Sequence, residues 1–274
     1  MEREERIASY PRSFVRFLGT AGSRFIMLSQ RRSSGGLWFS YGGAMGVIDP
    51  GPGSLVRICA ACPQLSALDI NTIILTHRHI DHSSDLNALV EGMTLRSAEK
   101  RGMVLLTDDC VSQGDSVLLN FAARKLKEIP KHADGHRTEL SPTATVESVI
   151  HKHHGIQCYG LIFRGAGLPT WGIISDTAAL PDFPKRYEEC GMIVINTTIP
   201  LPRAGLEHMS LSDVRSLLQV LHPQLAILTH MGGWVLDLGP DEAVGDLSTE
   251  KTRVIAARDG MIVDLEGQNP IQEG

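Results

Sequence analysis

The sequence predicts an α/β fold in four layers, a helix–sheet–sheet–helix (αββα) sandwich that forms a single domain over residues 1–274. Three observations predict it. Short apolar runs typical of strands alternate with helical stretches along the whole chain. Each half of the chain passes from strands into helices. No low-complexity segment or linker separates the halves, so we expect them to pack together as one unit.

The elements of the first half follow from apolar patterning and turn residues. Gly42-Gly43 predicts a hairpin between two strands, and Pro63 ends a helix. The predicted strands are residues 14–18, 37–41, 44–48, 72–75 and 103–106, and the predicted helices are 54–62, 83–90 and a stretch within 117–129. Cys59 and Cys62 lie in the first of these helices, and we expect both thiols to be buried as small apolar groups.

The second half repeats the pattern with more strands. Ser210 can cap a helix at its start. The predicted strands are residues 145–150, 157–164, 168–174, 192–195 and 225–228, and the predicted helices are 211–221 and a stretch around 240–250. Residues 254–257 and 261–265, separated by Asp259-Gly260, predict a closing hairpin.

Composition limits the classes of function. A net charge of −5 and a pI of about 6.1 argue against a bulk basic surface for a polyanion. The chain contains no apolar run of about 18 residues, so no membrane span is expected. Its first residues are charged and lack the apolar core of a secretory signal. With five cysteines in no framework spacing, these features favour a reducing cytoplasm.

Residues 72–82 are the stretch around which the chain is organised. A β-branched apolar run ends at Thr76, and four metal-ligand side chains follow within six residues: His77, His79, Asp81 and His82. Imidazoles and a carboxylate suit zinc, manganese or iron. His77 and His79 project to the same side of an extended chain, and Asp81 and His82 at the next turn can face a second ion.

This stretch resembles the T-H-x-H-x-D-H signature of the metallo-β-lactamase superfamily. The resemblance implies the αββα fold of that superfamily and a two-metal site. It also assigns Asp49, in the turn after the predicted strand 44–48, to a supporting position behind the ligands.

Three further ligands are expected from the second half. One histidine of His151, His153 and His154 completes the first site, and the resemblance selects His154 by its distance from Tyr159-Gly160. Asp176 ends an apolar strand, where a buried carboxylate needs a partner, and matches the superfamily's Ser-Asp-Thr motif. His230 follows Thr229 as His77 follows Thr76.

The expected ligands form two sets joined by Asp176. His77, His79 and His154 would hold one divalent cation, and Asp81, His82 and His230 the other, with zinc as the first expectation and Mn²⁺ or Fe²⁺ as alternatives. A hydroxide bridging the cations would be the nucleophile. Asp81 and His208 are the candidate catalytic residues, because His208 matches a family block whose histidine faces the scissile group.

The branch of the superfamily follows from the remaining motifs. Leu18-Gly19-Thr20 and the Tyr159-Gly160 spacing resemble ribonuclease Z and the cyclic phosphodiesterases, which implies a phosphodiesterase for a small diester, either cyclic or open-chain. Ile195 and Asn196 replace a histidine and a glutamate of ribonuclease Z, which disfavours an RNA 3′-end nuclease. Superfamily members that hydrolyse esters, lactones or thioesters place a metal ligand in a Pro-Gly-His loop, and this sequence does not contain one. A non-hydrolytic di-iron or accessory protein is the third alternative. Family members are often homodimers, and the resemblance implies the same here.

Overall fold

Two seven-stranded sheets form the centre of the computed structural model, which describes residues 10–95, 97–112 and 114–271. The first sheet runs in the spatial order β14 (Asn269–Ile271), β13 (Ile262–Asp264), β1 (Phe14–Phe17), β2 (Leu37–Tyr41), β3 (Ala44–Ile48), β4 (Thr72–Ile74) and β5 (Met103–Leu105). Its β3, β4 and β5 are parallel, and the strands from β14 to β3 are antiparallel.

The second sheet has the same mixed character. It runs in the spatial order β12 (Arg253–Ala256), β11 (Leu225–Thr229), β10 (Met192–Asn196), β9 (Trp171–Ile174), β8 (Tyr159–Gly165), β7 (Ala144–Ile150) and β6 (Arg137–Ser141). Strands β9 to β12 are parallel, and β6 to β9 are antiparallel.

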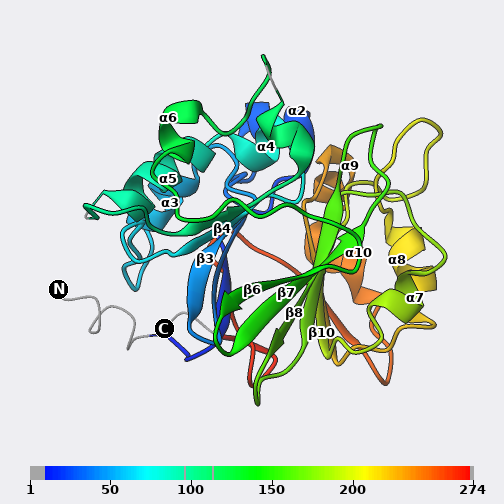
Figure 1. Ribbon diagram of the computed structural model, residues 1–274. Helices are drawn as coiled ribbons and strands as arrows, with labels where there is room; N and C mark the ends of the chain where they lie inside the picture. Colours follow the sequence, from blue (N-terminus) through cyan, green and yellow to red (C-terminus); the bar gives the residue numbers. More distant parts are fainter. Residues whose placement is uncertain (1–9, 96, 113, 272–274) are drawn as a thin grey trace.

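Helices cover the outer faces of both sheets. On the first sheet lie α3 (Ser54–Cys59), α4 (Ile80–Ser83), α5 (Leu86–Thr94), α6 (Asn120–Ala123) and the 3₁₀ turn η1 (Asp108–Val111). The other helices are α2 (Ser23–Ser29), α7 (Phe183–Arg186), α8 (Leu211–Leu218), α9 (Gly233–Asp237) and α10 (Pro240–Gly245). Figure 1 shows α3 and α5 beside β3 and β4, and α7 and α8 on the opposite side of the molecule, beyond β10.

Three apolar clusters separate the four layers. One lies between the first sheet and its helices, one between the sheets, and one between the second sheet and its helices. Neighbouring residues of one strand enter different clusters: Ile193 packs under the helices and Val194 packs between the sheets. Both faces of each strand are therefore buried, which explains the continuous apolar runs. The predicted αββα sandwich is confirmed.

The end of the chain differs from the prediction. Residues 254–257 and 261–265 do not form a hairpin, because β12 pairs with β11 in the second sheet and β13 pairs with β1 in the first. The chain crosses between the sheets at Asp259, whose carboxylate accepts hydrogen bonds from the Thr20 and Ser33 backbone N–H groups. Two apolar runs separated by Asp259-Gly260 suggested a hairpin, but each run pairs with a strand that is distant in sequence.

The described helices are mostly shorter than predicted, and several of them were missed. The helix expected within 117–129 is confined to α6, whereas α2, α7 and α9 were not predicted at all. Cys59 and Cys62 are both exposed, so the expectation of buried thiols is wrong. The helix α3 is six residues long and buries Ser54 and Ile58, which leaves Cys59 on its outer side, and Cys62 lies beyond the end of the helix. Every helix in the described part of the chain is too short or too polar to cross a bilayer.

Candidate metal centre

The expected ligand residues follow strand ends at one edge of the sandwich. In the first sheet, Asp49 follows β3 and His77 lies shortly after the parallel strand β4. In the second sheet, Asp176 lies just after β9, and His230 follows β11. Parallel strands bring their carboxyl ends to the same edge, which is where α/β proteins place ligand sites. The topology therefore gathers residues from both halves of the sequence.

A short glycine loop joins the two sheets at this edge. Met231 N–H donates to the Thr20 carbonyl at 2.9 Å, and Gly22 N–H donates to the Met231 carbonyl at 3.0 Å. A Cβ atom on Gly22 would lie 1.9 Å from the carbonyl oxygen of His230, so only glycine allows this approach. The loop sets the backbone position of His230.

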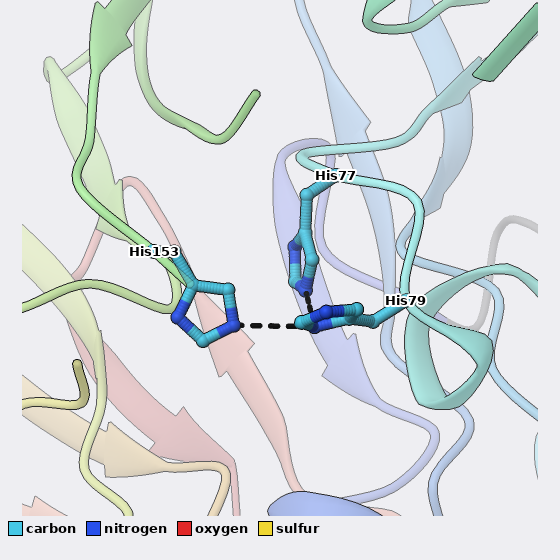
Figure 2. A group of neighbouring side chains, drawn as sticks. All are labelled: His77, His79 and His153. Carbon is cyan, nitrogen blue, oxygen red and sulfur yellow. Dashed lines mark hydrogen bonds between the residues drawn. The ribbon is translucent and has the colours of Figure 1, made fainter. Parts of the chain in front are cut away.

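The first group of ligand atoms consists of three imidazole nitrogens. His77 Nε2 lies 3.1 Å from His79 Nδ1, which in turn lies 3.2 Å from His153 Nε2. Figure 2 shows the three rings turned toward one another, His77 and His79 from the loop after β4 and His153 from a separate segment. Donors held 2.0–2.1 Å from one ion at tetrahedral angles would lie roughly 3.3 Å apart. The observed spacing fits one shared cation.

The histidine that joins this group is His153, not His154. His151 and His153 are buried, whereas Lys152 and His154 are exposed, as expected for an extended segment whose side chains alternate. A tight turn then closes with a 3.0 Å hydrogen bond from Ile156 N–H to the His153 carbonyl. The distance from Tyr159-Gly160 had selected His154. Because side chains of an extended segment alternate, moving one residue along the chain exchanges an inward side chain for an outward one.

The second group contains Asp81, His82 and His230. His82 Nε2 lies 3.0 Å from His230 Nε2, and Asp81 Oδ2 lies 3.6 Å from the same His230 atom. Asp81 and His82 lie in the single-turn helix α4, whereas His230 comes from the second sheet. The three residues that were expected to hold the second cation are therefore brought together.

Asp176 lies between the groups. Its Oδ2 atom is 3.6 Å from His82 Nε2 and 3.6 Å from His153 Nε2, one residue of each group. The side chain is 2% exposed, and its Oδ1 atom accepts a 2.8 Å hydrogen bond from the Asn196 amide. The Asn196 amide is a neutral donor, which suits a neighbouring carboxylate where a second carboxylate would repel it.

Hydrogen bonds fix the ring orientation of several candidate ligands. Asp49 Oδ2 accepts from His82 Nδ1 at 3.0 Å and from the Thr76 hydroxyl at 2.7 Å. Because that hydroxyl proton is committed to Asp49, the Thr76 oxygen can only accept from His77 Nδ1, 3.0 Å away. Both imidazoles are thus protonated at Nδ1, which leaves each Nε2 lone pair for a cation. The supporting position expected for Asp49 is found.

The same logic applies to the ligands from the second half. His153 Nδ1 donates to the carbonyl of Glu207 at 2.8 Å. Thr198 Oγ1 lies 3.1 Å from His230 Nδ1 and donates to the His230 carbonyl at 3.3 Å, so it accepts from that ring nitrogen. Glu207 and Thr198 were missed by the sequence analysis. Their only signal is proximity to residues already singled out, His208 and Asn196.

The titration behaviour of the first group and of Asp176 also suits cation binding. Burial lowers the pKa of His77 well below its usual value, and lowers the pKa values of His79 and His153 to about 4, so these rings are neutral near pH 7. For Asp176, burial alone would raise the pKa, but the neighbouring His230, His82 and His208 lower it well below the usual value. Neutral imidazoles and an ionised carboxylate are the forms that bind metals.

His208 lies beside the bridge residue. Its Nδ1 atom is 3.2 Å from Thr198 Oγ1 and 3.7 Å from Asp176 Oδ2. Burial lowers its pKa. Neighbouring His154 is exposed, with a positive φ of 44° and a ring centroid 5.5 Å from that of His208. His154 thus lies at the mouth of the site.

The remaining histidines lie outside the ligand groups. His151 is buried between Ser175 Oγ and the Tyr187 hydroxyl, each 3.1 Å away. His132 is buried, and its Nε2 atom lies 2.9 Å from the Leu75 carbonyl oxygen. His136 and His222 are exposed. Of the other acidic residues near the motif, Asp85 accepts from the Leu55 N–H and contacts no ligand histidine.

Comparison with known proteins decides the family. A family model described as the β-lactamase superfamily domain matches residues 47–231, which include all the ligand groups above. The chain belongs to the metallo-β-lactamase superfamily. It is therefore a member of a superfamily of metal-dependent hydrolases whose fold binds divalent metals.

Two curated relatives of this superfamily member are similar in sequence. An uncharacterized protein of Methanocaldococcus jannaschii, MJ1374, is 26% identical over 257 residues, which are 91% of this chain and 94% of the relative. The ribonuclease Z of Thermococcus sibiricus is 36% identical over 86 residues, only 31% of this chain and 26% of the enzyme.

Two solved structures show the same fold. The metallo-β-lactamase fold protein YhfI of Bacillus subtilis superposes with a TM-score of 0.75 at 18% identity, over 92% of this chain and 99% of that one. A diphosphatase from the PhnP family gives 0.65 at 18% identity, over 93% and 98% of the two chains. At these identities the likeness establishes the fold of this superfamily member and leaves its substrate open.

Proposed function

We propose that this protein is a two-metal phosphodiesterase that hydrolyses a small phosphodiester, with His208 as the proton donor. The observation that carries the proposal is the arrangement around Asp176. One carboxylate contacts both ligand groups, and His208 lies beside it. Two adjacent cations can clamp a phosphoryl group and supply a nucleophile from water at neutral pH.

The proposed ligands form two sets that share Asp176. His77, His79 and His153 would hold one cation, Asp81, His82 and His230 the other, and Asp176 both. Asp81 thus contributes through the cation that it helps to hold. His153 replaces His154 in the proposed set because its nitrogen is the one that reaches His79.

His208 is placed to protonate a leaving oxygen. Thr198 occupies its Nδ1 side, so Nε2 is the nitrogen that carries the transferable proton. The lowered pKa makes the protonated ring scarcer at neutral pH but a stronger acid. General acid catalysis contributes roughly 10²- to 10⁴-fold, and it matters most for a poor leaving group such as an alkoxide.

The test combines a metal count with two substrates. The metal-loaded enzyme and a His208→Ala variant would be assayed with bis-p-nitrophenyl phosphate and with a methyl alkyl phosphate. We expect about two metals per chain in both proteins, and a loss in the variant of at least about 100-fold on the alkyl ester. The loss should be smaller on the nitrophenyl ester, whose leaving group needs little protonation.

A matched control distinguishes chemistry from folding. His222→Ala removes an exposed histidine outside the ligand groups and should leave both rates unchanged. A fully metallated enzyme that hydrolyses neither diester would overturn the proposal, and carboxylic esters, thioesters and lactones would then be assayed.

A second candidate, an RNA 3′-end nuclease, is favoured by the local similarity to ribonuclease Z. Asn196 at the position of that enzyme's glutamate and the net charge of −5 count against it. Assays with a tRNA precursor and with 2′,3′- and 3′,5′-cyclic nucleotides would separate the two candidates. Cleavage of the precursor in preference to small diesters would favour the nuclease.

A further inference from the structure

His208 also lines a second hollow, which the ligand groups do not occupy. This hollow has a volume of about 360 Å³ and lies between the segment after Asp176 and the loop that connects β10 to α8. Its apolar wall includes Ala178, Pro202 and Leu206, and its polar wall contains Arg203, His208 and Asp213. We call it the Arg203 pocket. Because His208 belongs to both spaces, a group bound in this pocket is adjacent to the proposed proton donor.

Arg203 is the cation of this pocket. Its guanidinium carbon lies 5.1 Å from the centroid of the Trp234 ring, in a cation–π contact that restricts an otherwise exposed side chain. Across the described ranges, no carboxylate lies within ion-pair distance of Arg203. The other charged groups nearby are already engaged: Glu207 pairs with Lys152 at 3.2 Å, and Asp213 closes the capping box of α8.

The contact with Trp234 places Arg203 against a helix that lies close to the metal centre in sequence. Trp234 lies in α9, which begins three residues after His230, and Arg203 lies five residues before His208. Both contacting side chains therefore belong to segments that also carry site residues. The contact with Trp234 therefore links the loop that carries Arg203 and His208 to the helix that follows His230.

We propose that the Arg203 pocket binds the leaving-group portion of the substrate, and that this portion carries an anionic group on a short apolar chain. The inference rests on the proposed function. The apolar wall suits a few carbon atoms, the unpaired guanidinium suits a carboxylate or a phosphate, and His208 is beside the oxygen that departs. The substrate class is therefore a phosphodiester of an anionic alcohol.

The test uses substrates matched in length. Methyl 3-carboxypropyl phosphate and methyl butyl phosphate differ in charge at one end of the chain, and product analysis shows which ester bond is broken. We expect kcat/KM for release of the carboxylate alcohol to exceed that for butanol by at least about tenfold. Arg203→Met should abolish most of this preference, and Arg203→Lys should retain part of it. A substrate with a terminal phosphate in place of the carboxylate shows which anion is preferred.

Arg24→Met is the matched control, since Arg24 is an exposed arginine of α2 outside the pocket lining, and it should leave the preference unchanged. Equal rates for the two esters in the wild-type enzyme, or a preference that Arg203→Met does not reduce, would overturn the inference and leave the phosphodiesterase proposal standing.

A binding measurement keeps the two proposals separable. Trp38 and Trp171 are buried, whereas Trp234 is 51% exposed, so ligand-dependent fluorescence changes report chiefly on Trp234. Titration with 4-phosphonobutyrate should give tighter binding than with butylphosphonate, and Arg203→Met should equalise them. If neither ester is hydrolysed but this difference is found, the phosphodiesterase proposal fails and the anion site stands. If both phosphonates bind equally to the wild-type protein, the anion site fails.

Discussion

His153 Nε2 lies 3.2 Å from His79 Nδ1, and the adjacent His154 is exposed. This contact predicts that His153→Ala removes a metal ligand and lowers the metal content from about two ions per chain to about one. His154→Ala should keep both ions, because its side chain lies at the mouth of the site. Elemental analysis of both variants after dialysis measures the difference. Loss of an ion from the His154 variant alone would show that the sequence spacing had selected the right ligand.

Asp49 supports His82 through a 3.0 Å hydrogen bond at Nδ1. Asp49→Asn removes the negative charge that orients this imidazole, and we expect the affinity of one of the two metals to fall about 10- to 100-fold. Competition with a chromophoric chelator measures it. Asp241→Asn, which removes an exposed carboxylate paired with Arg258, is the control and should not change affinity. Equal affinities in the Asp49 variant and the wild-type protein would exclude the supporting role.

Glu207 connects the two loops at the mouth of the site. Its carboxylate accepts from the His154 N–H and pairs with Lys152 at 3.2 Å. Glu207→Gln keeps the size of the side chain but weakens both contacts, so we expect kcat to fall about tenfold through displacement of His208, with both metals retained. Steady-state kinetics with a metal count measures this. A loss of metal would instead assign the effect to His153, and an unchanged kcat would show that the connection is not needed.

His132 predicts a dependence of stability on pH. Burial lowers its pKa from 6.5 to about 4, so between these values the unfolded chain takes up a proton that the folded chain does not. Stability is therefore lost as pH falls through this range, by up to roughly 1.4 kcal/mol per pH unit. His132→Gln should flatten this part of the profile relative to wild type.

Denaturant unfolding of the metal-loaded proteins from pH 7 to pH 4 measures this, since the contribution of the metals is shared and cancels in the difference. His136→Gln, in the same turn but exposed, should follow the wild-type profile. Parallel profiles for the His132 variant and the wild-type protein would contradict the assignment.

The sequence predicted the four layers correctly and the pairing of the C-terminal strands incorrectly. Apolar runs such as residues 192–195 predicted buried strands because both faces of the second sheet are covered. The hairpin expected at residues 254–265 was wrong, because its strands pair with β11 and β1, partners that are distant in sequence. Local patterning specifies that a strand forms, whereas pairing depends on which edges are free after the sheets assemble.

The candidate site shows the same division. His77, His79, Asp81 and His82 were singled out because a strand end and short spacing already bring ligand atoms together. The tertiary structure decided three further features: the inward position of His153 in place of His154, the hydrogen bond from His153 to the Glu207 carbonyl, and the cation–π contact of Arg203 with Trp234. Which side chain of a loop faces inward depends on the turn that closes it, and contacts between distant segments depend on how the two sheets pack. The sequence by itself determined the family chemistry, and packing determined the residues that complete and surround it.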